Sequence, residues 1–150
     1  MTTPPTASEL LSNPAVLDGM RRAYHESNVG GINPVEQGAF IVRDLPDGAV
    51  AVTRLPAAAC DSLSYPICPD GTCEGRQIVG SFHTHPNTGP EWQQEPSPQD
   101  IRLSQDFPET MGPHQFVIAR NTVYHIDNNG VVSEMGSTSH LLGLDGGRST

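Results

Sequence analysis

Apolar residues near the N-terminus recur at the spacing of one face of an amphipathic helix. They lie one turn apart or side by side, at Val16, Leu17, Met20, Ala23 and Tyr24. Asn13 before Pro14 supplies an N-cap followed by a proline at the first helical position. The pattern predicts a helix that runs to about Ser27 and is ended by the glycine-rich residues 28–33.

Beyond that helix, short apolar runs alternate with turn sequences, as in a sheet. Strands are predicted over 37–43, 49–55, 76–85, 115–119, 122–127 and 131–135. A turn with the sequence LPDG joins the first two strands as a hairpin. Residues 56–75 and 86–96 are predicted to be loops, and a further helix is predicted to begin at Ser97. This order predicts an α+β domain with a mixed, mostly antiparallel sheet flanked by helices.

The length of 150 residues fits one domain. We expect this domain to span residues 13–136, between a flexible N-terminal segment 1–12 and a C-terminal tail 137–150. Both end segments are expected to be loose because they are rich in small and polar residues.

The charge pattern argues against nucleic acid as a partner. Eight Arg, no Lys and 17 Asp and Glu give a net charge of −9, and such a surface repels phosphate backbones. The lack of Lys is compatible with an effector that avoids ubiquitin attachment, although an Arg preference of a GC-rich genome explains it more simply.

No apolar run is long enough for a transmembrane helix, and the first residues do not resemble a Sec signal peptide. Localisation therefore stays open between the cytoplasm and export by another route.

Three cysteines, an odd number, do not form a complete disulfide framework. Cys68 and Cys73 flank a Pro-Asp-Gly-Thr turn and could form a single disulfide, which we leave open, while Cys60 has no evident partner. A cysteine zinc site is not expected because two further ligands are missing.

The sequence His83-Thr84-His85-Pro86 closes the predicted strand 76–85. Side chains two apart on a strand point to the same face, so both imidazoles can bind one metal ion. The alternative is a pair of partly exposed strand histidines without a metal. Pro86 ends the strand because it lacks a backbone donor.

The sequence Ser97-Pro98-Gln99-Asp100 has the pattern of a helix start with a serine N-cap. Its first turn places Asp100 near the end of the strand, where the carboxylate can be a third ligand beside the two histidines. Three protein ligands and an open position are typical of catalytic zinc, which lowers the pKa of a bound water to about 7. Such a site needs a general base, and Glu36, just before a predicted strand, is an admissible one.

These residues resemble the JAMM motif of JAB/MPN metallopeptidases. The motif places a Glu ahead of a strand, here Glu36 before Gln-Gly-Ala-Phe-Ile, then His-x-His-Pro, then Ser-x-x-Asp. The predicted order of elements matches that fold over roughly 13–135. The sequence is most similar to JAB-like domains of unknown function in Rhs-type polymorphic toxin proteins. The resemblance implies a JAB/MPN-like fold with cytidine-deaminase-like layering.

The resemblance also implies roles for particular residues. His83, His85 and Asp100 would bind one Zn²⁺ per chain, Glu36 would be the general acid/base, and Ser97 would hydrogen-bond the oxyanion. The 14 residues 86–99 between the second His and the Asp exceed the usual spacing of the motif, which we interpret as a loop insertion. Within it, Trp92 is expected either to cap the core or to form an apolar wall for a substrate.

The leading hypothesis is a zinc metallopeptidase or isopeptidase, with a zinc-bound water as the nucleophile and a Glu as the base. Members of the family cut conjugates of ubiquitin-like proteins, ordinary peptides or cell-wall peptides. A toxin or effector module would also have a carrier or immunity protein as a partner. The alternatives are a non-catalytic MPN-like binding or scaffold module that retains the metal site, and a zinc hydrolase of a non-peptide substrate.

Overall fold

The computed structural model describes residues 5–27, 35–44, 48–55, 58–59, 70–73, 75–85 and 95–144. The helices are α1 (Ala7–Leu11), α2 (Pro14–Glu26), α3 (Pro98–Asp106), α4 (Pro108–Met111) and α5 (Thr138–Leu141). The strands are β1 (Val35–Glu36), β2 (Gly38–Arg43), β3 (Val50–Arg54), β4 (Ala58–Ala59), β5 (Thr72–Cys73), β6 (Arg76–Thr84), β7 (Gln115–Ile118), β8 (Thr122–Ile126) and β9 (Val132–Ser137).

Seven strands form one twisted sheet in the order β3-β2-β6-β7-β8-β9, and β5 pairs with β6 outside this path. All neighbours in this sheet are antiparallel except β6 and β7, which are parallel. The two short strands β1 and β4 form a separate antiparallel pair. The prediction of an α+β domain with a mixed, mostly antiparallel sheet flanked by helices is confirmed.

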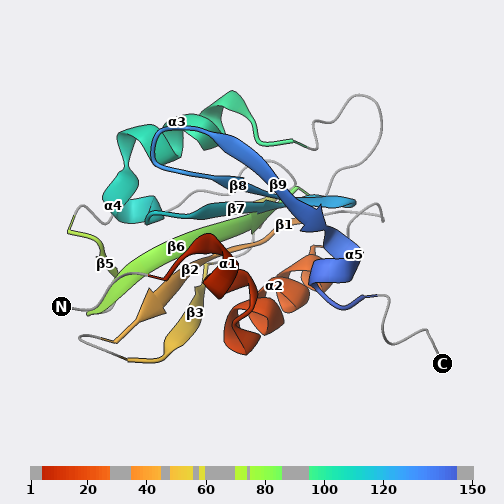
Figure 1. Ribbon diagram of the computed structural model, residues 1–150, viewed down its shortest axis with the longest axis horizontal. Helices are drawn as coiled ribbons and strands as arrows, with labels where there is room; N and C mark the ends of the chain where they lie inside the picture. The colour runs from red at the N-terminus through yellow and green to blue at the C-terminus, as the bar shows by residue number, and fades with distance from the viewer. Residues whose placement is uncertain are drawn as a thin grey trace.

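Helices cover both faces of the sheet (Figure 1). On one face lie α1 and α2, and the main core there comprises Leu10, Leu11, Val16, Met20, Ala23, Ala39, Ile41, Val79, Phe82, Phe116, Ile118, Val123 and Leu142. On the other face lie α3 and α4, and a smaller apolar cluster comprises Phe40, Val42, Leu55 and Ile78. The α2 helix follows the prediction, with the Asn13 side chain accepting hydrogen bonds from its first amides.

The parallel pair explains how the candidate site is assembled. Two neighbouring parallel strands need a crossover connection, which here contains α3 and α4 between β6 and β7. A helix that packs back across the sheet begins near the carboxyl end of the strand that precedes it. The end of β6, with its two histidines, is therefore brought beside the first turn of α3.

The described parts of both end segments contain regular structure that the sequence did not predict. Within the segment 1–12, α1 has a complete capping box between Thr6 and Glu9, and its Leu10 is 1% exposed. Within the expected tail 137–150, β9 reaches Ser137, α5 follows, and Leu142 is fully buried in the main core. The expectation of loose ends was wrong for these residues because a few apolar side chains attach each end to the core.

Several short elements were also absent from the prediction. Strands β4 and β5 lie within the expected loop 56–75, and α4 begins at Pro108 directly after α3. Elements of two to four residues carry too little hydrophobic periodicity to be recognised in a sequence. Their conformation depends on the strands and helices that they contact.

Candidate metal centre

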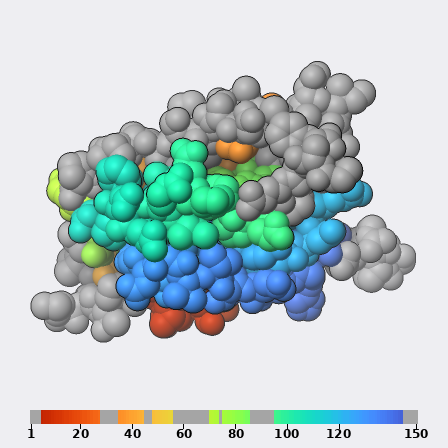
Figure 2. All heavy atoms as spheres, turned by 90° about the horizontal axis from the view of Figure 1, so that it is seen from above, coloured from red at the N-terminus to blue at the C-terminus, as the bar shows by residue number. Residues whose placement is uncertain are grey.

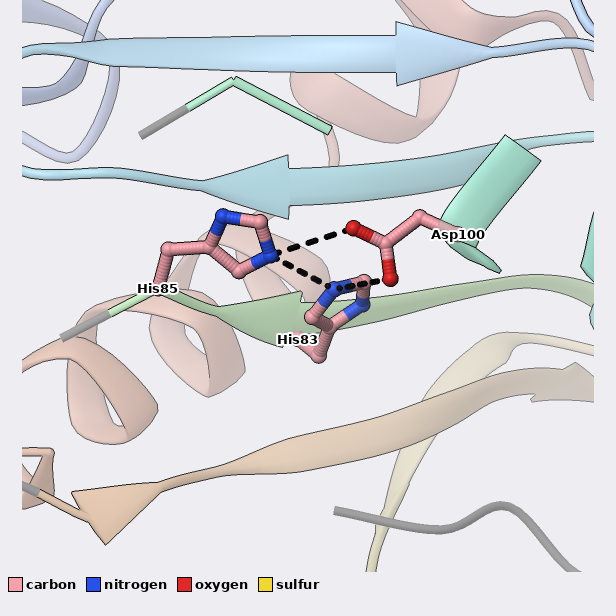
Figure 3. Close-up of side chains that lie close together, drawn as sticks. All are labelled: His83, His85 and Asp100. Atoms are coloured by element: carbon pink, nitrogen blue, oxygen red, sulfur yellow. Dashed lines mark hydrogen bonds and ion pairs between the residues drawn. The ribbon is translucent and has the colours of Figure 1, made fainter. Parts of the chain in front are cut away.

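Three side chains that the sequence analysis singled out meet at one point. The Nε2 atoms of His83 and His85 are 3.3 Å apart, and His85 Nε2 lies 3.1 Å from Asp100 Oδ2. His83 Nε2 lies 3.2 Å from Asp100 Oδ1. Figure 3 shows both rings and the carboxylate converging from the strand end and the helix start. Each residue offers one ligand atom, so the group could hold a metal ion.

The strand explains why both rings face the same way. His83 belongs to β6 and pairs with Gly38 of β2 and Val117 of β7, so it lies in the middle of the sheet. His85 follows directly, and its backbone N–H donates to the Ile118 carbonyl at 2.9 Å. This bond continues the extended backbone by one residue beyond β6, and the two-residue period then directs both imidazoles to the face covered by α3.

Asp100 is oriented by the start of its own helix. Its backbone N–H donates to the Ser97 hydroxyl oxygen at 3.1 Å, and the Ser97 backbone N–H donates to Asp100 Oδ2 at 2.8 Å. This reciprocal capping box confirms the predicted helix start and fixes the carboxylate in one rotamer. The role of Ser97 towards an oxyanion stays a prediction.

The electrostatics of the cluster are dominated by burial and by the pairing of opposite charges. Burial alone would raise the pKa of the Asp100 carboxyl, but the two histidines outweigh it and hold this pKa well below its usual range. Burial lowers the pKa of His83, and attraction by Asp100 and Glu36 reverses that effect, so the net pKa is raised. Asp100 is therefore a carboxylate at neutral pH, which is the form that binds metals.

Glu36 lies within electrostatic reach of this cluster. Its carboxylate contributes to the raised pKa of His83. Glu36 also lies two residues before Gly38, the β2 partner of His83, and extended backbone places both on the face of the sheet that carries the histidines. Its position is thus compatible with the expected role as a base, and the role itself stays a prediction.

The elements of the candidate site border a hollow in the surface. Figure 2 shows orange atoms of the residues 35–44 and light-green atoms of β6 together in this hollow, beside the green and teal atoms of α3. His83 is 4% exposed and Asp100 is 9% exposed, so both side chains are buried.

Gln115 supports the candidate metal centre and was not expected from the sequence. Its side chain is fully buried and donates to the Asp100 carbonyl at 2.9 Å and to the Ser104 hydroxyl at 2.7 Å. Both bonds attach the first turns of α3 to β7. The signal in the sequence was a lone amide at the start of the apolar run QFVIA, since a buried polar side chain needs partners.

Other predicted features lie elsewhere. Trp92, most of the loop insertion, Cys60 and Cys68 lie outside the described residues, so the disulfide question stays open. Cys73 lies in β5 and packs against the smaller apolar cluster. None of the helices in the described ranges combines the length and the apolar character that crossing a bilayer requires.

No protein-family model matches the sequence, and no curated protein matches it. The function is therefore inferred from the geometry of the site.

Proposed function

We propose that this protein is a zinc-dependent hydrolase of the metallopeptidase or isopeptidase type. The observation that carries the proposal is the convergence of His83, His85 and Asp100, whose ligand atoms all lie within 4.8 Å of one another. The similarity of the surrounding motif to JAMM peptidases supplies the class of substrate, a peptide or isopeptide bond.

The donor set and its spacing fit zinc. Nitrogen and oxygen ligands lie about 2.0–2.1 Å from Zn²⁺, so two ligands of a tetrahedral site are about 3.3–3.4 Å apart. The three separations here are 3.1, 3.2 and 3.3 Å, close to that edge length. Three protein ligands leave one position of a tetrahedron for water or substrate, as in catalytic rather than structural sites.

When bound, the metal ion would polarise the substrate carbonyl and make water acidic enough to attack at neutral pH. The residues of the chain would supply the remaining steps. The Glu36 carboxylate would accept the proton of the attacking water and deliver it to the leaving amine. The Ser97 hydroxyl accepts the helix-capping bond from Asp100 and keeps its own proton to donate to the oxyanion.

The test of the metal centre is the metal content of the purified protein, measured by elemental mass spectrometry. We expect about one zinc per chain, and loss of that zinc in His83→Ala and in Asp100→Ala. His140→Ala is the matched control because His140 is exposed and lies in α5, away from the cluster. Zinc-free wild-type protein after reconstitution, or unchanged zinc in both ligand variants, would refute the proposal.

The test of catalysis uses Glu36→Gln. We expect this variant to fold and to bind zinc as the wild type does, but to lose peptide or isopeptide hydrolysis by about 100-fold or more. A wild type that binds zinc and cleaves no substrate of a peptide and isopeptide panel would instead favour a non-catalytic MPN-like module that retains the metal.

A further inference from the structure

A second polar cluster lies behind the metal centre, on the opposite face of β6. Thr84 sits between the two histidine ligands, so its side chain points away from them, towards α2. There it meets Ser27 at the end of α2 and the backbone of Gln37 between β1 and β2. Thr84 and Ser27 are fully buried and Gln37 is 7% exposed, so their polar groups need hydrogen-bond partners within the protein.

The hydrogen bonds of this cluster hold one residue, Gln37, through the two peptide groups that flank it. The Gln37 backbone N–H donates to the Thr84 hydroxyl oxygen at 3.0 Å. The Thr84 backbone N–H donates to the Gln37 carbonyl at 2.9 Å. Gln37 is therefore attached to β6 through its donor and its acceptor, and one of the two bonds depends on a side chain.

The Thr84 hydroxyl has a partner for its own proton as well. Ser27 Oγ donates to the Ala23 carbonyl at 2.7 Å, which uses its only proton. The Thr84 hydroxyl has two acceptors within reach, Ser27 Oγ at 2.6 Å and the Gln37 carbonyl at 3.4 Å, and the shorter contact is then a donation from Thr84 to Ser27. Thr84 Oγ1 thus accepts from Gln37 and donates to Ser27, so the cluster is satisfied and favours one arrangement.

This arrangement bears on Glu36 because Glu36 and Gln37 share a peptide bond. The backbone position of Glu36 is set by where that peptide lies. Thr84, which lies between His83 and His85 in the chain, holds that peptide through its hydroxyl oxygen. The carboxylate of Glu36 and the two imidazoles then project to the other face from backbones that are tied together.

We propose that Thr84 is a positioning residue, whose hydroxyl holds the Glu36–Gln37 peptide at a fixed place relative to the two histidines. The expected effect of Thr84 on catalysis rests on the proposed function. The hydrogen bond from the Gln37 amide to Thr84 does not depend on that function, and a separate experiment measures it.

The test compares Thr84→Val, which replaces the hydroxyl by a methyl group of similar size, with Thr84→Ser, which keeps it. In Thr84→Val we expect kcat to fall about 10- to 100-fold, because a displaced base acts poorly. KM and the Kd for zinc should stay within about threefold of wild type, since substrate and metal contacts are not removed. Thr84→Ser should keep kcat within about threefold of wild type, because it retains the hydroxyl.

Amide hydrogen exchange of the metal-free protein supplies a readout that needs no activity. The Gln37 amide should exchange at least about tenfold faster in Thr84→Val than in wild type and Thr84→Ser, while the Ile118-bonded amide of His85 stays protected. A wild-type protein that neither binds zinc nor hydrolyses a substrate would refute the proposed function. The exchange rate of the Gln37 amide would still show whether Thr84 holds Gln37.

Three results would overturn the inference. The first is Gln37 exchange that is equal in Thr84→Val and wild type. The second is an active wild type whose kcat the Val substitution leaves unchanged. The third is loss of zinc together with activity in Thr84→Val but not in Thr84→Ser, because Thr84 would then position the metal ligands and not the base.

Discussion

At the scale of single residues, two histidine pairs differ in what they face. The rings of the metal centre face a carboxylate, whereas His114 and His125 face each other at 2.8 Å between Nδ1 and Nε2. His114 Nε2 lies 3.0 Å from the Pro5 carbonyl, which only accepts, so that nitrogen carries a proton. The pKa of each ring is lowered, so both are neutral at neutral pH, and His114 Nδ1 then accepts from His125 Nε2. Burial is the main reason that the pKa of each is lowered.

This second pair predicts a loss of stability in mild acid. The pKa values of His114 and His125 are lower in the folded chain than the value of about 6.5 in the unfolded chain. The unfolded chain therefore takes up protons first as the pH falls. The stabilisation is complete above about pH 6.5 and is lost as the pH falls through the folded-state values. Urea unfolding of the metal-free protein at about pH 7.5 and about pH 5.5 measures this loss.

The control for this prediction is the double variant His114→Phe/His125→Phe. It removes both titrating rings and keeps aromatic packing beside Phe116, whose ring lies 5.4 Å from that of His125. All other titrating groups are shared with the wild type. An equal loss of stability in the wild type and the double variant would show that the pair contributes nothing.

At the scale of elements, the same capping motif serves two helices differently. Thr6 and Glu9 form a capping box at the start of α1, and Ser97 and Asp100 form one at the start of α3. The Glu9 carboxylate is exposed, whereas the Asp100 carboxylate also contacts both histidines. The cap of α3 therefore positions a ligand in addition to starting a helix.

Removing each cap separates these two roles. Thr6→Ala and Ser97→Ala should each lower the free energy of unfolding by about 1 kcal/mol, since each loses one helix-capping acceptor. Only Ser97→Ala should weaken zinc binding, by about tenfold, because the Asp100 backbone N–H loses its acceptor and the helix turn that carries the carboxylate is held less firmly. Urea unfolding and a zinc competition titration measure the two effects, and equal zinc affinities of the two variants would contradict the prediction.

At the scale of the whole molecule, the ligands lie at the two ends of a long connection. His83 lies near the end of β6, His85 follows β6 directly, and Asp100 lies in the first turn of α3. The unfolded chain does not hold them together, so a metal ion would bind the folded state preferentially. Binding energy at this site is then also folding energy.

Zinc should therefore stabilise the fold as a whole. At a free concentration about 100-fold above Kd, the gain is about 2.7 kcal/mol, and a chelator should abolish it. Thermal unfolding with zinc and with chelator measures the shift in Tm. His83→Ala should show no shift, whereas the exposed-site control His140→Ala should respond as the wild type does. A wild-type Tm that is the same with zinc and with chelator would contradict the prediction.

Prediction from the sequence succeeded where a local signal was strong. The helix with its cap at Asn13, the hairpin of β2 and β3, and the helix start at Ser97 all carry a clear periodicity or a cap. It failed for the chain ends, because the burial of Leu10 and Leu142 depends on the core that they contact and not on their neighbours in sequence. Short elements such as α4 were missed for the same reason, because their conformation depends on the elements that they contact.

The sequence by itself determined the chemistry that this protein can offer. It placed two histidines on one side of a strand, an aspartate in the first turn of a helix and a glutamate ahead of another strand, because these relations follow from local backbone periods. Only the tertiary structure decided that the strand end and the helix start meet within 3.1–3.3 Å, that Gln115 secures one of them, and that Thr84 ties the other to the Glu36 segment. Distances between residues far apart in the chain depend on packing and on buried hydrogen bonds, which no local pattern encodes.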